Sequence, residues 1–244
     1  MARRAHEIGV PVIYGSESVM ERGRIDLAPG DLVAGSVGFV LHALRQLKVI
    51  APSHTPYPSV LAPWLRRKVS WHPTLSGVLA DLQVNNPVFV KPAKGWKRFT
   101  GFVAQVPDDP RFNGASRRDP VWTSSTLDLL SEWRVYVVRG SIRAIKFADY
   151  GGLRTVTPDE SEIHQAVTTL VQAGHAPAGF AIDFAVDSLG RTVLVEVNDG
   201  FSLGAYDDID GAVYWDVIAA RRSELLASSS KVSAAATFSN EYYN

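Results

Sequence analysis

The stretch Thr192-Val193-Leu194-Val195-Glu196-Val197-Asn198 decides the fold, because it reads as a buried strand that carries two polar side chains. Side chains alternate between the two faces of a strand, so Glu196 and Asn198 share one face. The apolar run before this stretch carries Asp183, and a turn signal at residues 187–190 predicts a hairpin that sets the two strands side by side. We therefore expect the oxygens of Asp183, Glu196 and Asn198 to converge.

Three converging oxygen donors indicate a site for a hard divalent cation. Proteins usually hold Mg2+ with one or two carboxylates together with the phosphates of a bound nucleotide. A single residue of this kind would more simply be a surface carboxylate or a turn cap. Carboxylates on two adjacent apolar strands do not fit that interpretation, because burying them without a counter-charge is costly. The sequence predicts a Mg2+ site at Asp183, Glu196 and Asn198, with Mn2+ as an alternative ion.

The composition excludes several classes of function. Twenty-five Lys and Arg residues balance 25 Asp and Glu residues among the 244, so no overall field attracts nucleic acid or an anionic membrane. Cysteine is absent, which excludes disulfides, thiolate catalysis and cysteine-type zinc sites. The six histidines are scattered without metal-ligand spacing. Because no signal peptide or membrane-spanning segment is recognised, we expect a cytoplasmic protein.

A basic segment provides a second candidate for nucleotide binding. Lys91 ends an apolar strand just before Pro92, where a lysine can bind a phosphate as a point charge. The loop at residues 94–101 contains glycines and basic side chains, and it predicts a hairpin whose return strand begins at Phe102. Alone, this loop would be a solvated basic turn, but beside a metal site we interpret it as a cover for a polyphosphate. The contacts expected from this segment are Lys91, Lys94, Gly95, Trp96, Lys97 and Arg98.

Charged residues also occur on a predicted hairpin, whose strands at residues 133–138 and 142–147 are joined by a turn at 139–141. Arg134 is the strongest candidate for catalysis, because a preorganised guanidinium stabilises a transferring phosphoryl group. Charged residues on strands are as often surface residues, and that alternative stays open for the other members of the set. These are Glu132, Arg139, Arg143 and Lys146.

Further elements are predicted at both ends of the chain. Residues 10–14 and 31–34 have the composition of strands, and residues 38–47 have helical spacing. Near the C-terminus we expect a helix from about Ala212 to Leu226 and, past Ala227, a loosely held tail.

The segment before Asp183 predicts a helix with clear end signals. Thr157 suits the N-cap, Pro158 suits the first helical position, and Gly174 suits the C-terminal end. After Asn198, a polar loop follows for which ordinary turn chemistry is the simpler interpretation and recognition of an incoming amine is the alternative. Its candidate residues are Asp199, Ser202, Tyr206, Asp207 and Asp208.

Taken together, these motifs resemble the ATP-grasp superfamily of carboxylate–amine ligases, in the order in which that family carries them, over roughly residues 63–226. Glu196-Val197-Asn198 is the most specific match, and with Asp183 it resembles the metal triad of the family. The strand that ends at Lys91 resembles the one whose lysine contacts ATP phosphates. Glu132-Trp133-Arg134 and the loop at 198–204 are similar to those of the compact clade named for two arginines and a lysine.

The resemblance implies roles for further residues. Arg67-Lys68 looks like a basic element that precedes the nucleotide-binding lobe, with Lys68 as the expected nucleotide contact. The adenine hinge is expected near Trp122, Thr123 and Ser124. Arg134, Lys146 and Arg143 are the expected catalytic residues.

The resemblance also implies the fold and the reaction. We expect an α/β (α+β) ATP-grasp fold with a short N-terminal lobe at 1–62, a lid lobe at 63–127, a C-terminal lobe with the metal site at 128–226 and a tail at 227–244. The expected activity is ATP- and Mg2+-dependent joining of a carboxylate to an amine through an acyl phosphate. The substrates would be small molecules or peptides rather than nucleic acid or membrane, and the oligomeric state stays open. A phosphotransferase of the same fold and a non-catalytic ATP-binding module are the alternatives.

Overall fold

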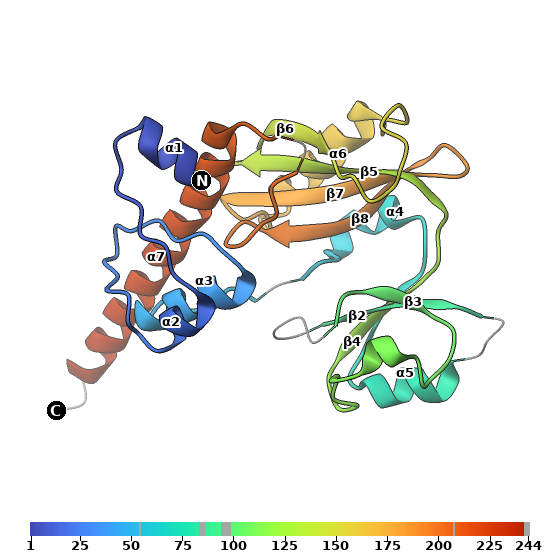
Figure 1. Ribbon diagram of the computed structural model, residues 1–244, viewed down its shortest axis with the longest axis horizontal. Helices are drawn as coiled ribbons and strands as arrows, with labels where there is room; N and C mark the ends of the chain where they lie inside the picture. Colours follow the sequence, from blue (N-terminus) through green and yellow to red (C-terminus); the bar gives the residue numbers. More distant parts are fainter. Residues whose placement is uncertain (54, 83–85, 94–98, 207, 242–244) are drawn as a thin grey trace.

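The chain builds two four-stranded antiparallel sheets that lie apart and are joined by the main chain (Figure 1). The computed structural model describes residues 1–53, 55–82, 86–93, 99–206 and 208–241. This arrangement of antiparallel sheets and helices is the α+β class that the sequence predicts.

The first sheet has the strand order β1-β4-β2-β3. Its core lies on one face, where Val90 and Phe102 pack against the helix α5 and the side chain of Phe112. The predicted return strand from Phe102 is confirmed, since β3 pairs with β2. The elements are β1 (Val69–His72), α5 (Leu75–Asp81), β2 (Val88–Pro92), β3 (Phe102–Ala104), the 3-10 turn η2 (Pro110–Phe112) and β4 (Val121–Ser125).

The second sheet has the strand order β6-β5-β7-β8 and is packed on both faces. Val135 and Phe180 share a core with Ile163 of α6 on one face, whereas Tyr136 and Ala181 pack against α7 on the other. Both hairpins predicted here are confirmed, because β5 pairs with β6 and β7 pairs with β8. The elements are β5 (Leu129–Val138), β6 (Ser141–Phe147), α6 (Glu160–Gln172), β7 (Gly179–Asp187), β8 (Thr192–Asp199) and α7 (Gly211–Glu241).

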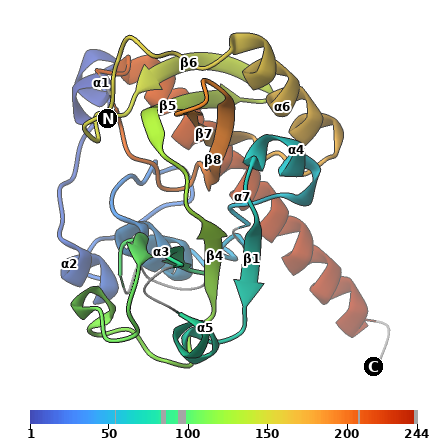
Figure 2. The same ribbon diagram turned by 90° about the vertical axis from the view of Figure 1, so that its right-hand side faces the viewer.

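The chain passes directly from the first sheet to the second, since β4 leads into β5 through three residues (Figure 2). Before the first sheet, the chain forms a 3-10 turn, η1 (Ser59–Leu61), and the short helix α4 (Ala62–Leu65). Leu61 and Leu65 are buried in the core of the second sheet. The segment that precedes the first sheet is therefore anchored on the second one.

The N-terminal segment contains helices rather than the predicted strands. No described residue of 10–14 or 31–34 belongs to a strand, so both strand predictions are wrong. Ile13 and Tyr14 are about three-quarters exposed (74% and 76%) and thus lack the packing that favours a strand. The predicted helix at 38–47 is confirmed, with the hydroxyl of Ser36 as its N-cap. The helices are α1 (Ala2–Glu7), α2 (Glu17–Glu21) and α3 (Val37–Gln46).

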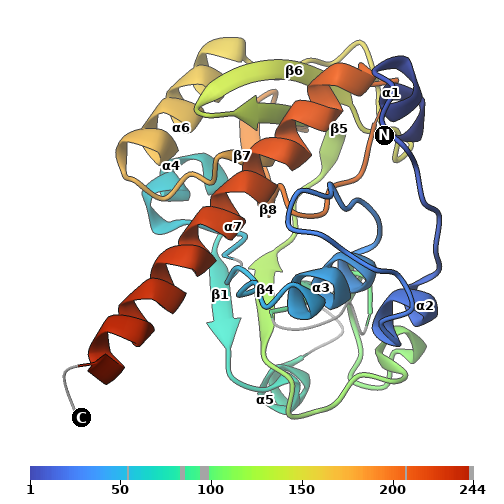
Figure 3. The same cartoon turned by 90° about the vertical axis from the view of Figure 1, so that its left-hand side faces the viewer.

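The C-terminal helix α7 is longer than predicted, continuing to Glu241, and its distal end projects away from the sheets (Figure 3). Residues past Ala227 are thus helical as far as Glu241, and Ile50 donates a backbone hydrogen bond to Ser229 Oγ (3.2 Å). A loosely held tail stays a prediction. The helix packs so closely on β7 that a Cβ added to Gly179 would lie 2.0 Å from the carbonyl oxygen of Val217.

Helix α6 begins later than predicted. Its N-cap is Asp159 rather than Thr157, because Asp159 Oδ1 accepts hydrogen bonds from the backbone of Ser161 (2.7 Å) and Glu162 (3.2 Å). Gly174 follows the helix with φ of +70°, as its end signal predicts. Among the described residues, no helix has the length and apolar character that a membrane crossing requires.

Candidate active site

Four charged residues form a row across the second sheet. In the strand register, Lys146 of β6 faces Arg134 of β5, Arg134 faces Asp183 of β7, and Asp183 faces Glu196 of β8. Directly paired residues of antiparallel strands point to the same face, so all four side chains stand on one side of the sheet. The next pair along β7 and β8, Ala181 and Asn198, places Asn198 on the same face.

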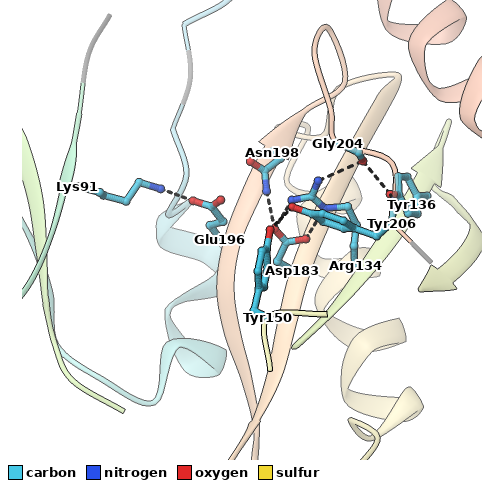
Figure 4. A network of polar contacts seen from close by, with 9 residues as sticks. All are labelled: Lys91, Arg134, Tyr136, Tyr150, Asp183, Glu196, Asn198, Gly204 and Tyr206. Carbon is cyan, nitrogen blue, oxygen red and sulfur yellow. Dashed lines mark hydrogen bonds and ion pairs between the residues drawn. The ribbon is translucent and has the colours of Figure 1, made fainter. Parts of the chain in front are cut away.

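At the centre of this row, Arg134 and Asp183 form a buried bidentate ion pair (Figure 4). Nε and Nη2 of Arg134 lie 2.7 and 2.6 Å from the two carboxylate oxygens of Asp183. The two residues are only 5% and 2% exposed. Asn198 Nδ2 donates to Asp183 Oδ2 at 2.9 Å, so the predicted triad members on β7 and β8 are in contact.

The ion pair keeps the guanidinium charged. Burial acts to lower the pKa of Arg134, but the hydrogen bonds and the charge of Asp183 outweigh it, and the net pKa is raised. Arg134 also stacks on the ring of Tyr206, whose centroid lies 4.2 Å away, and donates to the Gly204 carbonyl at 3.3 Å. The side chain is therefore held in one orientation by three partners.

Glu132 adds a further acid to the same face. It lies two residues before Arg134 on β5, so strand alternation points both side chains to the same side. Burial, followed by the charges of Asp183 and Glu196, raises the pKa of Glu132 to about 7. The partly buried position of Glu132 therefore favours its uncharged form up to about neutral pH.

The two sheets meet at Lys91 and Glu196. Lys91 lies near the end of β2 in the first sheet, and its Nζ contacts Glu196 Oε2 of the second sheet (Figure 4). Its ammonium group also lies over the ring of Tyr57, 5.1 Å from the centroid. Trp122, the strand partner of Lys91, packs edge-to-face on the same ring, with 5.2 Å between centroids. The sequence analysis did not predict that Tyr57 contacts this site, because its partners Lys91 and Trp122 are distant in the sequence.

Arg67, next to Lys68 in the predicted basic element, is bound to both sheets. Its Nη1 and Nη2 donate to the carbonyl oxygens of Leu194 (2.6 Å) and Val195 (2.9 Å) on β8, and its Nε donates to Ser124 Oγ (3.3 Å) on β4. Arg67 therefore links the two sheets, and burial lowers its pKa. Lys68 lies beside it and joins β4 through its backbone, which donates to Ser125 Oγ (3.3 Å).

Other predicted nucleotide contacts lie in different surroundings. Thr123 of β4 is buried, and its hydroxyl hydrogen bonds to His72 Nε2 (2.9 Å), away from Lys91. Residues Lys94, Gly95, Trp96, Lys97 and Arg98 lie outside the described part of the chain.

Arg143 lies apart from the charged row. It falls beside a register shift of the β5–β6 pair, and its Nη2 is 3.5 Å from Asp216 of α7, with both side chains more than 40% exposed. The ion-pair partner of Arg143 is thus on α7, and the catalytic role expected for Arg143 stays a prediction.

The polar loop after β8 contributes to the site through Gly204 and Tyr206. Asp199 is held by Arg221 of α7 (2.5 and 2.7 Å), and Ser202 donates to the Gly35 carbonyl (2.9 Å). The backbone N–H of Tyr206 donates to the Tyr136 hydroxyl (3.1 Å), and the Tyr206 hydroxyl bonds to that of Tyr150. Asp207 lies outside the described residues, and Asp208 is exposed.

The donor set on β7 and β8 fits a hard divalent cation. Asp183, Glu196 and Asn198 carry oxygen atoms on one face of the sheet, and oxygen is the donor type that such a cation binds. Within the described ranges, no group of three or more His, Asp or Glu side chains is arranged to hold a metal, so the third ligand would have to be the Asn198 amide.

Comparison with known proteins gives similarities at low sequence identity. No curated protein matches the chain. The N5-carboxyaminoimidazole synthetase from Staphylococcus aureus is 14% identical, with a TM-score of 0.43, over 67% of this chain and 49% of that one. The D-alanine-D-alanine ligase from Coxiella burnetii is 17% identical, with a TM-score of 0.44, over 75% of this chain and 59% of that one.

The macrocyclase MdnC from Microcystis aeruginosa, bound with a precursor peptide, is 14% identical with a TM-score of 0.45. The match covers 66% of this chain and 58% of that one, so the chain spans about half to three-fifths of the length of all three proteins. A family model matches residues 64–217, which include both sheets; it describes the ATP-grasp domain of family 2 in the clade named for two arginines and a lysine. Because this match covers more than half of the chain, the protein belongs to the ATP-grasp superfamily, in family 2 of that clade.

Proposed function

We propose that the protein is an ATP-dependent, ADP-forming ligase that activates a carboxylate as an acyl phosphate and joins it to an amine. Membership of the ATP-grasp superfamily supports this reaction class. The observation that carries the proposal is the meeting of Lys91 with Glu196, because it sets a phosphate-binding cation opposite the acids of the second sheet.

In this proposal ATP lies between the two sheets. Lys91 leaves Glu196 and takes the nucleotide phosphates, since an ammonium group binds a phosphate as a point charge. A Mg2+ ion held by Asp183, Glu196 and Asn198 would neutralise charge on the terminal phosphates. For Asn198 to present its oxygen, its amide must turn away from the Asp183 carboxylate that it now contacts.

The phosphoryl group passes from ATP to the substrate carboxylate, which gives an acyl phosphate and ADP. Arg134 is positioned to stabilise the developing negative charge, because Asp183, Gly204 and Tyr206 already fix its guanidinium. Lys146 stands beside Arg134 in the row and adds a second positive charge. The amine, after releasing its extra proton to solvent, attacks the carbonyl carbon. The C–N bond forms, phosphate leaves as the C–O bond breaks, and the nitrogen gives up a second proton to the departing phosphate.

Adenine is proposed to bind near β4, where the chain passes from one sheet to the other. Trp122 and Ser124 lie on the face of β4 that carries Lys91 on the neighbouring strand, whereas Thr123 faces the core of the first sheet. The first two therefore remain proposed nucleotide contacts. Lys68 is also retained, since its backbone bonds to Ser125 at the same end of β4.

The proposal is tested by measuring ADP release with panels of carboxylates and amines. A ligase requires both substrates for steady turnover, whereas a phosphotransferase releases ADP with the carboxylate or a hydroxyl alone. A non-catalytic module binds Mg2+ and ATP without turnover. Glu196→Gln should abolish ADP release, and Asn198→Ala should raise the Mg2+ concentration required. Steady release without any amine would overturn the ligase assignment.

A further inference from the structure

Glu132 differs from the other acids on this face in how its carboxylate is paired. Asp183 is paired with Arg134, and Glu196 contacts Lys91. For Glu132, no described residue forms a hydrogen bond or an ion pair with the carboxylate. Half-buried carboxylates in proteins are normally paired, so this one calls for a positively charged partner from outside the chain.

Small residues flank Glu132 on the neighbouring strands. Its register partner on β7 is Ala185, and on the other side the backbone N–H of Ala148 donates to the Glu132 carbonyl at 2.9 Å. Alanine side chains are short and apolar, so these two neighbours offer the Glu132 carboxylate neither a side-chain hydrogen bond nor a counter-charge.

The loop after β6 is hydrogen-bonded to the part of β5 that carries Glu132. This loop is tied to β5, since Leu153 N donates to Leu130 O (2.7 Å) and Trp133 Nε1 donates to Val156 O (3.0 Å). It carries Tyr150, whose hydroxyl bonds to Tyr206 beside Arg134 (Figure 4). Burial, followed by the hydrogen bond to Tyr206, raises the pKa of Tyr150.

We propose that Glu132 binds the protonated amine of the acceptor substrate. This inference rests on the proposed ligase function and names the group that receives one of its two substrates. Alkyl and α-amino groups are largely protonated at neutral pH, so the acceptor arrives as an ammonium ion with three N–H donors. A bound ammonium ion favours the ionised form of Glu132, which then supplies the opposite charge.

The position of Glu132 suits the binding of an amine substrate better than the binding of a second metal ion. Glu132 lies two residues along β5 from the Arg134–Asp183 pair, so an ammonium bound there is next to the residue that we assign to the acyl phosphate. A metal needs several oxygen donors, whereas here one carboxylate faces alanines on both sides. The loop acid Asp199 is unsuited to the role, because Arg221 already neutralises it.

The inference is tested by NMR titration of glycinamide, a small primary ammonium without a carboxylate, in the presence of Mg2+ and a non-hydrolysable ATP analogue. We expect saturable binding to the wild type and an affinity at least about tenfold weaker for Glu132→Gln, which keeps the shape but loses the charge. Glu132→Asp, which keeps the charge, should bind within about threefold of the wild type. Glu160→Gln, at an exposed position of α6, is the matched control and should bind unchanged.

Several outcomes would overturn the assignment. These are absence of saturable glycinamide binding to the wild type, equal affinity for Glu132→Gln, and loss of Mn2+ binding in that variant, which would make Glu132 a metal ligand. Titration of the ATP analogue is run on the same samples. If the analogue binds and glycinamide does not, the role of Glu132 fails while the nucleotide site stands. If the analogue fails to bind the wild type, the proposed function fails.

Discussion

At the scale of single residues, the site depends on how each buried charge is neutralised. Asp183 is almost fully buried, and Arg134 is its neighbour across the strands as well as its bidentate partner. Such a pair contributes little net stability by itself, but removing one partner leaves an uncompensated charge in an apolar environment. The roles of Arg134 in folding and in catalysis are therefore coupled.

Replacing Arg134 should destabilise the protein. Arg134→Ala is expected to lower the free energy of unfolding by about 3–5 kcal/mol, because the Asp183 carboxylate remains buried without its cation. The double variant Arg134→Met with Asp183→Leu removes both charges and should recover most of the loss. Urea denaturation measures both. An unfolding free energy within about 1 kcal/mol of wild type for Arg134→Ala would contradict this argument.

Glu132 gives a prediction for the pH dependence of stability. Its pKa in the folded state is about 7, against an ordinary value of 4.5, so the folded protein binds a proton more tightly than the unfolded chain. The stability that the protonated Glu132 side chain provides to the folded protein is fully present below pH 4.5. It is lost as the pH rises through the folded-state pKa of about 7. In the presence of EDTA, Glu132→Gln should thus be more stable than wild type at pH 8 by about 3 kcal/mol.

The difference between Glu132→Gln and the wild type should disappear at about pH 4, where the folded proteins carry an uncharged side chain at this position. Chemical denaturation at the two pH values measures it. Addition of Mg2+ should reduce the difference at the higher pH, because a cation on this face favours the ionised carboxylate. Equal stabilities of the two proteins at that pH would show that the Glu132 carboxylate is not destabilised in the folded state.

At the scale of elements, two glycines allow close backbone contacts at the start of β7, one with α7 and one with the end of β8. A Cβ on Gly179 would lie 2.0 Å from the Val217 carbonyl, and one on Gly200 would lie 2.1 Å from the Gly179 carbonyl. Neither glycine has a positive φ, so close approach rather than turn geometry requires them. The strand β7, which carries Asp183, is in this way held directly against the helix.

Gly179→Ala should therefore displace α7 from β7. We expect the free energy of unfolding to fall by about 3 kcal/mol, since backbone atoms on both sides cannot move aside cheaply. Gly30→Ala is the control, because a Cβ there meets no atom within 4 Å. Thermal and urea denaturation of the two variants measure the difference. Equal stability of both would mean that helix and strand separate at little cost.

At the scale of the whole molecule, the two sheets are joined by polar contacts as well as by the chain. Arg67 donates to β8 and to Ser124 of β4, while Lys91 of β2 contacts Glu196 of β8. The Arg67 contacts to β8 involve backbone carbonyls and are compatible with a bound nucleotide. The Lys91 contact has to open, since the proposed function assigns both of its members to the nucleotide and its metal.

Lys91→Ala should weaken nucleotide binding much more than folding. We expect the affinity for Mg2+ with a non-hydrolysable ATP analogue to fall about 10- to 100-fold, because a charged hydrogen bond to phosphate is lost. The free energy of unfolding should change by about 1 kcal/mol or less. Isothermal titration calorimetry measures the affinity, with Lys48→Ala, in the loop after α3, as control. Unchanged affinity would remove Lys91 from the site.

The sequence alone determined the hairpin of β7 and β8 and the common face of its polar residues. This was possible because strand alternation and a turn are local properties, and Asp183 and Asn198 are only 15 residues apart. It also determined the β5–β6 and β2–β3 pairs and the family, which depends on the order of such motifs. The apolar composition of residues 10–14 wrongly predicted a strand, because this segment, which contains Ile13, is exposed and lacks a packing partner among the described residues.

Only the tertiary structure decided which charges meet. Arg134 and Asp183 are 49 residues apart and Lys91 and Glu196 are 105 apart, so no sequence period relates them. The same holds for the contact of Lys91 with the ring of Tyr57, for the hydrogen bonds of Arg67 to both sheets, and for the ion pair of Arg143 with Asp216. Sequence patterns specify what each element buries, whereas the partners of a buried charge depend on how the elements pack together.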